Sequence, residues 1–317
     1  MLRSRLAPTP SGYLHLGNAV NFILTWLLVR RADGRLKLRI DDADAGRSRP
    51  EYIEDIFRQL EWLGLDWDLG PAGPDEFTAR YSQLQRLERY RAGLNALQAQ
   101  QVLFFCHCTR RQIKKISADH LYPGTCRSRF QAPVEPHTVR IRVPHRWVFD
   151  PASQEAAWPF AAAWPTSGEQ APKTLLRETP SLPPVLLATE MGDFILWRRD
   201  NLPAYQLASL LDDLDDEINL IVRGLDLLPS TAAQVFLAEQ LGPAGAAFLG
   251  AEFLHHPLLT DRQGRKLAKS DQALSLAAMR AAGTSPAAVY RRAARFLGLP
   301  ADEINTLADL LAAVTAP

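Results

Sequence analysis

Residues 2–31 read LRSRLAPTPSGYLHLGNAVNFILTWLLVRR, and this stretch decides the fold. It predicts a short strand over residues 2–7, then a Pro/Gly turn, then a helix over Leu16–Arg31, where apolar side chains recur at helical spacing. Further along, residues 36–40 alternate apolar and basic side chains like a strand, and residues 50–63 are again helical. The order strand, helix, strand, helix predicts an α/β protein with a parallel sheet.

The elements after this first unit are predicted from shorter patterns. Residues 151–190 are rich in Ala, Pro and Ser without clear periodicity, which predicts an irregular insertion. Further helices are predicted over 81–100 and 205–211, after Ser230 and through the Ala/Leu-rich tail at 273–316, and further strands over 102–105, 138–143, 194–197 and 218–222.

Composition sets the broad class of protein. The chain has 317 residues, of which 47% are hydrophobic and 22% charged, as in an ordinary soluble globular protein. No apolar run approaches the roughly 20 residues that span a bilayer, and the N-terminus leads directly into a turn instead of a signal-peptide core. A formal net charge of +1 neither requires nor excludes a nucleic-acid partner, because RNA binding needs only a local basic patch. We expect a cytoplasmic monomer with no membrane partner.

Two distant segments carry nucleotide chemistry. His15, Gly17 and Asn18 stand at the predicted start of the first long helix, where unpaired N–H groups and a partial positive charge favour phosphate. The His15 and Asn18 side chains add donors, and Gly17 lets a ligand approach the backbone. Downstream, Lys266 and Lys269 follow a turn-rich loop and can place two ammonium groups around a triphosphate. Singly, the first segment is more often a plain turn and the second a solvated basic loop.

Together the two segments resemble the HIGH and KMSKS signatures of class I aminoacyl-tRNA synthetases in order, separation and setting. A wider resemblance, to the glutamyl-tRNA synthetase group, covers residues 3–272 with 151–190 as the main gap. It rests on RLAPTPSG at 5–12, LRIDD at 38–42 and VRGLDLL at 222–228. The resemblance implies a Rossmann-like catalytic domain, ATP as a substrate, catalytic roles for His15, Lys266 and Lys269, and ATP contacts from His15, Gly17, Asn18 and Lys269.

The residue types agree with a glutamate substrate. Arg5 and Arg223 can hold a carboxylate through forked guanidinium contacts. Asp41 can pair with the substrate ammonium group and Tyr205 can donate from its hydroxyl, although Arg5 could equally be a surface strand residue and Tyr205 a core aromatic. The resemblance implies glutamate contacts from Arg5, Ala7, Thr9, Asp41, Tyr205 and Arg223. Asp41 stands where the group usually has Glu and Thr9 where it has Ser, so this chain departs from the group in the glutamate site.

The three cysteines form a second candidate site. Cys106, Cys108 and Cys126 are too few and too odd in number for a disulfide scaffold and suit tetrahedral zinc. Three buried structural thiols are the alternative. From chemistry alone, the fourth ligand is His120 or, less well placed between two cysteines, His107. Cys-x-Cys followed by Tyr-x-x-x-Cys resembles the zinc site of glutamyl-queuosine tRNA(Asp) synthetases, which implies Tyr122 as the fourth ligand of a structural site.

The C-terminal segment is too short for the helical anticodon-binding region of full glutamyl-tRNA synthetases. We expect the first half of a Rossmann-like class I synthetase catalytic domain (1–100), an inserted zinc-binding connective subdomain (101–192), the second half with the lysine loop (193–272) and a short helical C-terminal segment (273–317), with no anticodon-binding domain.

This organisation and the cysteine pattern both resemble glutamyl-queuosine tRNA(Asp) synthetases. The resemblance implies that the chain activates glutamate with ATP and transfers it to the queuosine base of tRNA(Asp). The implied partners are glutamate, ATP with Mg²⁺, a structural Zn²⁺ and tRNA(Asp) carrying queuosine. Two alternatives stay open: a glutamate–tRNA ligase that esterifies a tRNA 3′ end, and a non-catalytic synthetase-like binding paralogue.

Overall fold

The computed structural model describes residues 1–117, 121–129, 135–153, 182–258 and 275–315. Its first unit is the predicted one. Strand β1 (Arg3–Leu6) is followed by helix α1 (Leu16–Arg31) and by strand β2 (Arg35–Leu38), which pairs in parallel with β1 from Arg3 opposite Arg35 to Leu6 opposite Leu38. Helix α2 (Pro50–Trp62) comes next, with Pro50 at its first turn. The parallel α/β arrangement is therefore confirmed.

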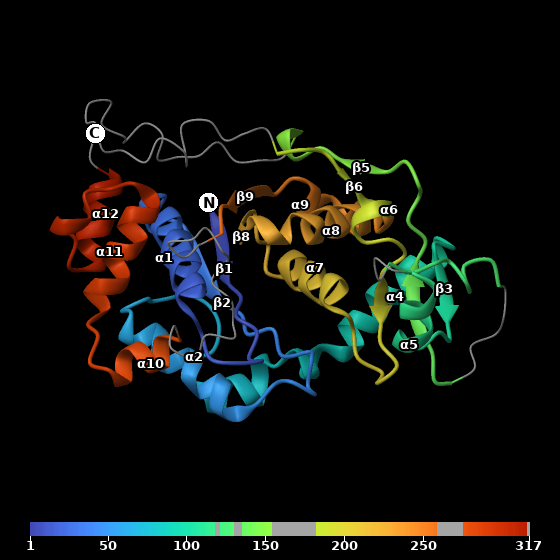
Figure 1. Ribbon diagram of the computed structural model, residues 1–317, viewed down its shortest axis with the longest axis horizontal. Helices are drawn as coiled ribbons and strands as arrows, with labels where there is room; N and C mark the ends of the chain where they lie inside the picture. Colours follow the sequence, from blue (N-terminus) through green and yellow to red (C-terminus); the bar gives the residue numbers. More distant parts are fainter. Residues whose placement is uncertain (118–120, 130–134, 154–181, 259–274, 316–317) are drawn as a thin grey trace.

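A second parallel pair lies beside the first. Strands β8 (Leu220–Gly224) and β9 (Glu252–His256) pair in parallel with Leu220 opposite Glu252. The Ser4 hydroxyl donates to the Leu220 carbonyl at 2.8 Å and the Asn219 N–H donates to the Arg3 carbonyl at 3.1 Å, which places β8 next to β1. Strand β9 has no counterpart among the predicted elements. Helices α7 (Tyr205–Asp215) and α8 (Leu228–Gln240) flank these strands in Figure 1.

The middle of the chain builds a small antiparallel sheet. It has the order β3 (Leu103–Cys106), β4 (Thr138–Ile141), β7 (Ile195–Trp197), with helices α4 (Leu87–Ala99) and α5 (Arg110–Ile116) nearby in Figure 1. The expectation of an irregular stretch at 151–190 is wrong at its described C-terminal end. There β6 (Val185–Leu186) pairs with β5 (Val148–Phe149), and helix α6 (Leu187–Glu190) follows. Residues 154–181 lie outside the described residues.

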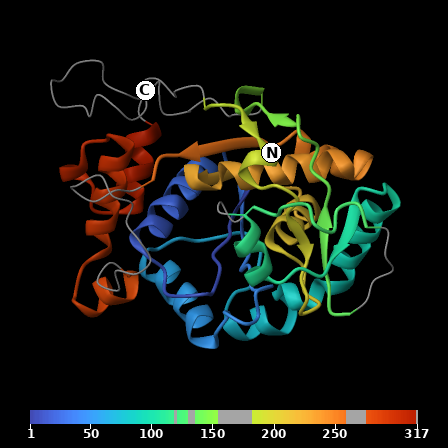
Figure 2. The same cartoon turned by 45° about the vertical axis from the view of Figure 1, so that its right-hand side comes forward.

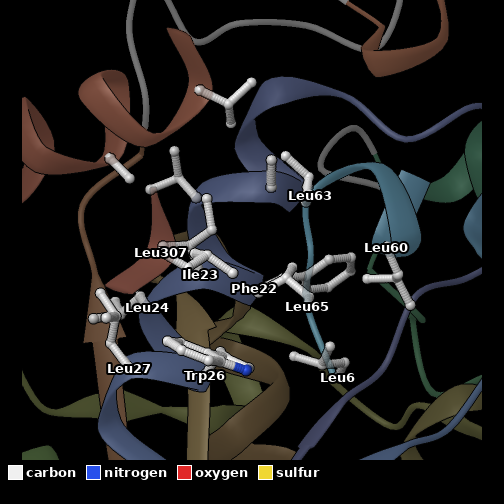
Figure 3. Packing of buried hydrophobic residues seen from close by; sticks show 14 of the residues in the cluster. Leu6, Phe22, Ile23, Leu24, Trp26, Leu27, Leu60, Leu63, Leu65 and Leu307 are labelled. Carbon is white, nitrogen blue, oxygen red and sulfur yellow. The ribbon is translucent and has the colours of Figure 1, made fainter. Parts of the chain in front are cut away.

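The C-terminal helices share the core of the first unit. Helices α11 (Pro286–Leu297) and α12 (Leu307–Thr315) are the red helices beside the blue α1 in Figure 1 and again in Figure 2, and helix α10 (Leu276–Ala281) lies next to α2. Figure 3 shows Leu307 close to Ile23 and Leu24 of α1. These residues belong to one buried cluster that also contains Leu6, so the tail and the parallel sheet form a common core. Two short helices, α3 (Pro74–Glu76) and α9 (Ala246–Leu249), are also present.

Among the described residues, no helix combines the length and apolar character needed to cross a membrane.

Candidate active site and metal centre

A cavity of about 1040 Å³ opens where β1 and β8 end and α1 begins. Ligand sites of open α/β sheets lie at the carboxyl ends of the parallel strands, so the position is the expected one. Asp41 does not line it, and Lys266 and Lys269 lie outside the described residues. The predicted site residues that do line it are Arg5, Ala7, Thr9, His15, Gly17, Asn18, Tyr205 and Arg223.

The start of α1 forms one wall of the cavity. His15 is the N-cap: its Nδ1 accepts from the Asn18 N–H at 3.4 Å, and the Asn18 side-chain oxygen accepts from the His15 N–H at 3.0 Å. A Cβ atom on Gly17 would meet the His15 ring at 2.9 Å, so a side chain at this position would displace the imidazole. The first turn of α1 holds no acidic residue, which leaves its positive end suited to phosphate.

Arg5 and Arg223 approach one another through a shared carboxylate. The Arg5 Nε donates to Asp213 Oδ1 at 2.9 Å, Arg39 Nη1 lies 2.5 Å from the same oxygen, and Arg223 Nη2 lies 3.8 Å from Oδ2. Burial opposes ionisation of Asp213, but the three arginines outweigh it and hold its pKa below the usual range. One carboxylate cannot neutralise both Arg5 and Arg223, so this end of the cavity carries excess positive charge.

Arg223 has more hydrogen-bond donors than it has partners among the described residues. Its Nη1 donates to Thr231 Oγ1 at 3.1 Å, while Nε and Nη2 are buried with no hydrogen-bond partner among the described residues. Burial, assisted by Arg5, holds the pKa of Arg223 below its usual value although Tyr205 opposes the shift. Buried donors of this kind are normally satisfied, so the geometry fits a bound carboxylate that accepts from the guanidinium fork.

Thr231 also contacts His255, whose Nε2 lies 2.9 Å from its hydroxyl. Burial, with the charge of Arg223, lowers the pKa of His255 to about 3, so this imidazole is neutral near pH 7. It therefore adds no positive charge to the arginine cluster.

Tyr205, at the start of α7, lines the same cavity. Its side chain is 39% exposed, so it lies on the solvent-facing side of the site.

Asp41 is placed differently from the other predicted glutamate contacts. Its carboxylate is buried and accepts from Arg39 Nε at 2.7 Å and Nη2 at 3.3 Å. Gln83 adds a longer contact of 3.4 Å. The side chain is thus engaged by Arg39, the same arginine that contacts Asp213, and links the second strand to the arginine cluster behind the cavity.

The three cysteines come together as predicted. Their sulfur atoms lie within 4.8 Å of one another, with Cys108 Sγ 3.7 Å from Cys126 Sγ. Tyr122 Oη lies 4.0 Å from Cys108 Sγ and accepts from the Cys126 N–H at 2.7 Å. The structure thus brings Tyr122 to the thiols, whereas His120 lies outside the described residues. Burial and the neighbouring Cys106 raise the pKa of Cys108 to about 11, because thiolates cannot gather without a cation. This soft donor set fits a divalent metal such as Zn²⁺.

Asp213 is the main site residue that sequence reasoning missed. It stands in the acidic run Asp212-Asp213-Leu214-Asp215-Asp216, which looks like a solvated helix end. Asp213 is nevertheless fully buried, because Arg5, Arg39 and Arg223 surround it. The available signal was the excess of arginines at strand ends, which must be balanced by a buried acid.

Comparison with known proteins assigns the family. The family described as tRNA synthetases class I (E and Q), catalytic domain, matches residues 1–147 and 183–313. The chain belongs to this family and carries its α/β catalytic domain.

Among curated relatives, the glutamyl-Q tRNA(Asp) synthetase of Symbiobacterium thermophilum is 40% identical over 94% of this chain and 87% of its own length. That of Nitratidesulfovibrio vulgaris is 36% identical over 100% of this chain and 94% of its own. The glutamate–tRNA ligase of Anaeromyxobacter sp. (strain K) is 34% identical over 98% of this chain, which spans only 60% of that relative. A solved glutamate–tRNA synthetase from Elizabethkingia anophelis has the same fold, with a TM-score of 0.65, 24% identity, and coverage of 85% of this chain and 53% of that one.

Proposed function

We propose that the protein activates glutamate with ATP and transfers the glutamyl group to the queuosine base of tRNA(Asp). The observation that carries the first half is the pair of unsatisfied Arg223 nitrogens beside Arg5, at one end of a cavity whose other wall is the start of α1. One end suits a carboxylate and the other a polyphosphate. The second half is supported by two relatives named glutamyl-Q tRNA(Asp) synthetase that align over nearly their whole length.

The residues take the following roles in this proposal. The glutamate side chain binds between Arg5 and Arg223, with Ala7, Thr9 and Tyr205 around it. Asp41, which is held by Arg39 and does not line the cavity, acts on the substrate ammonium group through its negative charge and not by direct contact. ATP lies along His15, Gly17 and Asn18, and Lys266 and Lys269 contact its phosphates, accompanied by Mg²⁺. We also propose that the catalytic domain consists of two halves separated by a connective insertion and followed by a short C-terminal segment. The protein acts as a monomer in the cytoplasm.

Two steps then follow. An oxygen of the glutamate α-carboxylate bonds to the α-phosphorus of ATP, and the bond to pyrophosphate breaks. Positive charge at the α1 N-terminus and from the lysines stabilises the departing pyrophosphate. A hydroxyl of the queuosine cyclopentenediol next attacks the adenylate carbonyl, loses its proton and releases AMP. The protein contributes mainly positioning and electrostatic stabilisation.

We further propose that Cys106, Cys108, Tyr122 and Cys126 hold a structural Zn²⁺. Four protein ligands would close the coordination sphere, which is typical of a structural site. Within the described ranges, the buried cluster around it is small, so a metal would supply stability that such a core lacks. Its members are Phe104, Cys106, Ile113, Tyr122 and Cys126.

A two-part assay tests the function. Purified protein should catalyse glutamate-dependent ATP–pyrophosphate exchange without tRNA, with aspartate and glutamine as parallel substrates because Asp41 replaces the usual Glu. Labelled glutamate should then enter tRNA(Asp) that carries queuosine and not the same tRNA lacking it. Nuclease digestion should assign the label to the anticodon fragment. Label on the 3′-terminal nucleotide would instead establish a glutamate–tRNA ligase, and absence of exchange would indicate a non-catalytic paralogue.

A further inference from the structure

Arg140 of β4 packs against the ring of Tyr122. Its guanidinium carbon lies 4.1 Å from the centroid of that ring, well inside the range of a cation–π contact. Phe104 of β3 packs against the same ring, with centroids 5.8 Å apart and planes inclined by 34°. Arg140 and Phe104 are directly opposite one another in the β3–β4 register, so two neighbouring strands present both side chains to Tyr122.

The guanidinium of Arg140 is itself fixed. Arg140 is 7% exposed, and its Nη1 donates to the Asp193 carbonyl at 2.7 Å. The Asp193 carboxylate in turn accepts from the Val143 N–H at 2.9 Å and pairs with Arg127. This buried hydrogen bond to the backbone holds the guanidinium in place, because moving it would leave Nη1 without a partner, as Nε already is among the described residues. Arg140 therefore presents a fixed guanidinium face to the tyrosine ring.

The hydroxyl end of Tyr122 is oriented from the other side. Its Oη accepts from the Cys126 N–H at 2.7 Å and lies 4.0 Å from Cys108 Sγ. The ring contacts and the hydrogen bond from the Cys126 N–H together fix where the oxygen lies relative to the thiols. Partners that orient a metal ligand without touching the metal typically change metal affinity by about 10- to 100-fold when removed.

We propose that Arg140 is a positioning residue for the metal centre, which holds Tyr122 in the orientation of a ligand. The inference rests on the proposed metal site. Charge supports it: three thiolates and a phenolate around a divalent cation carry a net negative charge, and a buried guanidinium next to them offsets it. Arg140 is the arginine whose charge lies directly on a proposed ligand ring.

The chain supplies a matched control. Arg142 lies two residues further on and places its guanidinium carbon 5.3 Å from the centroid of the Phe104 ring, one ring removed from Tyr122. Arg140→Met, Arg140→Lys and Arg142→Met would each be made in the full chain and also combined with Tyr122→Phe. Zinc content would be measured by elemental analysis, and the zinc dissociation constant by competition with a chromophoric chelator.

Arg140→Met should weaken zinc binding about 10-fold or more, Arg140→Lys should restore most of the affinity, and Arg142→Met should change it less than about twofold. In the Tyr122→Phe background, Arg140→Met should have no further effect. The visible spectrum of the Co²⁺-substituted Arg140→Met protein should match that of Tyr122→Phe, because both lose the oxygen ligand.

Each contrary result has a distinct meaning. Wild-type affinity in Arg140→Met overturns the positioning role while the metal site stands. An equal loss in the Tyr122→Phe background also overturns it, because Arg140 would then act on the loop as a whole and not through the tyrosine. Wild-type protein that binds no zinc overturns the metal site and the positioning role together, and leaves the glutamate-dependent exchange assay as a separate test of the proposed function.

Discussion

Arg223 combines near-complete burial with two guanidinium nitrogens that have no hydrogen-bond partner among the described residues. Replacement by Lys keeps the charge and removes the fork, so one point contact replaces two directed ones. We expect Arg223→Lys to lower kcat/KM for glutamate in pyrophosphate exchange by about 10- to 100-fold, mostly through KM. Arg3→Lys is the control, because Arg3 pairs with an exposed Glu217 outside the cavity. A glutamate KM unchanged in Arg223→Lys would remove Arg223 from the substrate site.

Single residues were predictable where a motif fixes them and unpredictable where a tertiary partner does. His15, Arg5 and Arg223 follow from their segments, and the cavity unites them. The pairing of Asp41 with Arg39, in the segment that follows β2, was not anticipated from the sequence. Asp213 was missed because nothing local distinguishes the buried Asp212 and Asp213 from the more exposed Asp215 on the same helix.

Among the helices and strands too, a boundary was predictable where local sequence sets it and not where distant partners do. Both ends of α1 were predicted correctly, because a Pro/Gly turn and a polar cap precede an unbroken apolar pattern. Helix α7 was expected to end at residue 211 and continues to Asp215, because Asp212 and Asp213 find buried partners that sequence cannot show. Strand β9 was not predicted because its short apolar stretch ends in two histidines. Both histidines are buried beside β8.

The buried acid Asp212 gives α7 a measurable pH dependence. Burial raises its pKa to about 6, even though Arg39 and Arg86 oppose the shift. The folded state therefore binds a proton more readily than the unfolded chain, and this residue makes the free energy of unfolding fall as pH rises from about 4 to 6. His255 acts in the opposite sense, because its lowered pKa makes the free energy of unfolding rise with pH across the same range.

We expect Asp212→Asn to isolate the contribution of Asp212. Relative to wild type, the free energy of unfolding of the variant should gain about 2 kcal/mol between pH 4.5 and 6.5, because the buried charge no longer forms. Urea unfolding at the two pH values provides the measurement. Asp215→Asn on the same helix, at a partly exposed position, should leave the difference as in wild type. If the free energies of unfolding of Asp212→Asn and wild type changed equally between the two pH values, Asp212 would not be the source of this pH dependence.

One of the buried clusters of the molecule joins its first strand and helix to its C-terminal helices. Leu310 of α12 is fully buried in the cluster that includes α1 and β1, whereas Leu311 only packs against it from its rim. Leu310→Ala should cost about 2–5 kcal/mol of unfolding free energy and Leu311→Ala clearly less. Thermal unfolding of Leu310→Ala should stay a single transition, since the tail and the sheet share one core. A separate early transition would show that the C-terminal helices fold as an independent unit.

Arg5 and Asp213 form their contact only after a long interval of protein synthesis. The two residues are 208 positions apart in the chain and yet form one buried ion pair. At roughly 5–20 residues per second, a ribosome needs on the order of 10–40 s to deliver Asp213 after Arg5. During this interval β1 has neither its β8 neighbour nor the acid that balances its arginine. The nascent N-terminal half therefore presents an open strand edge and uncompensated charge, and the arginine cluster that we propose for glutamate is complete only once synthesis has passed Arg223.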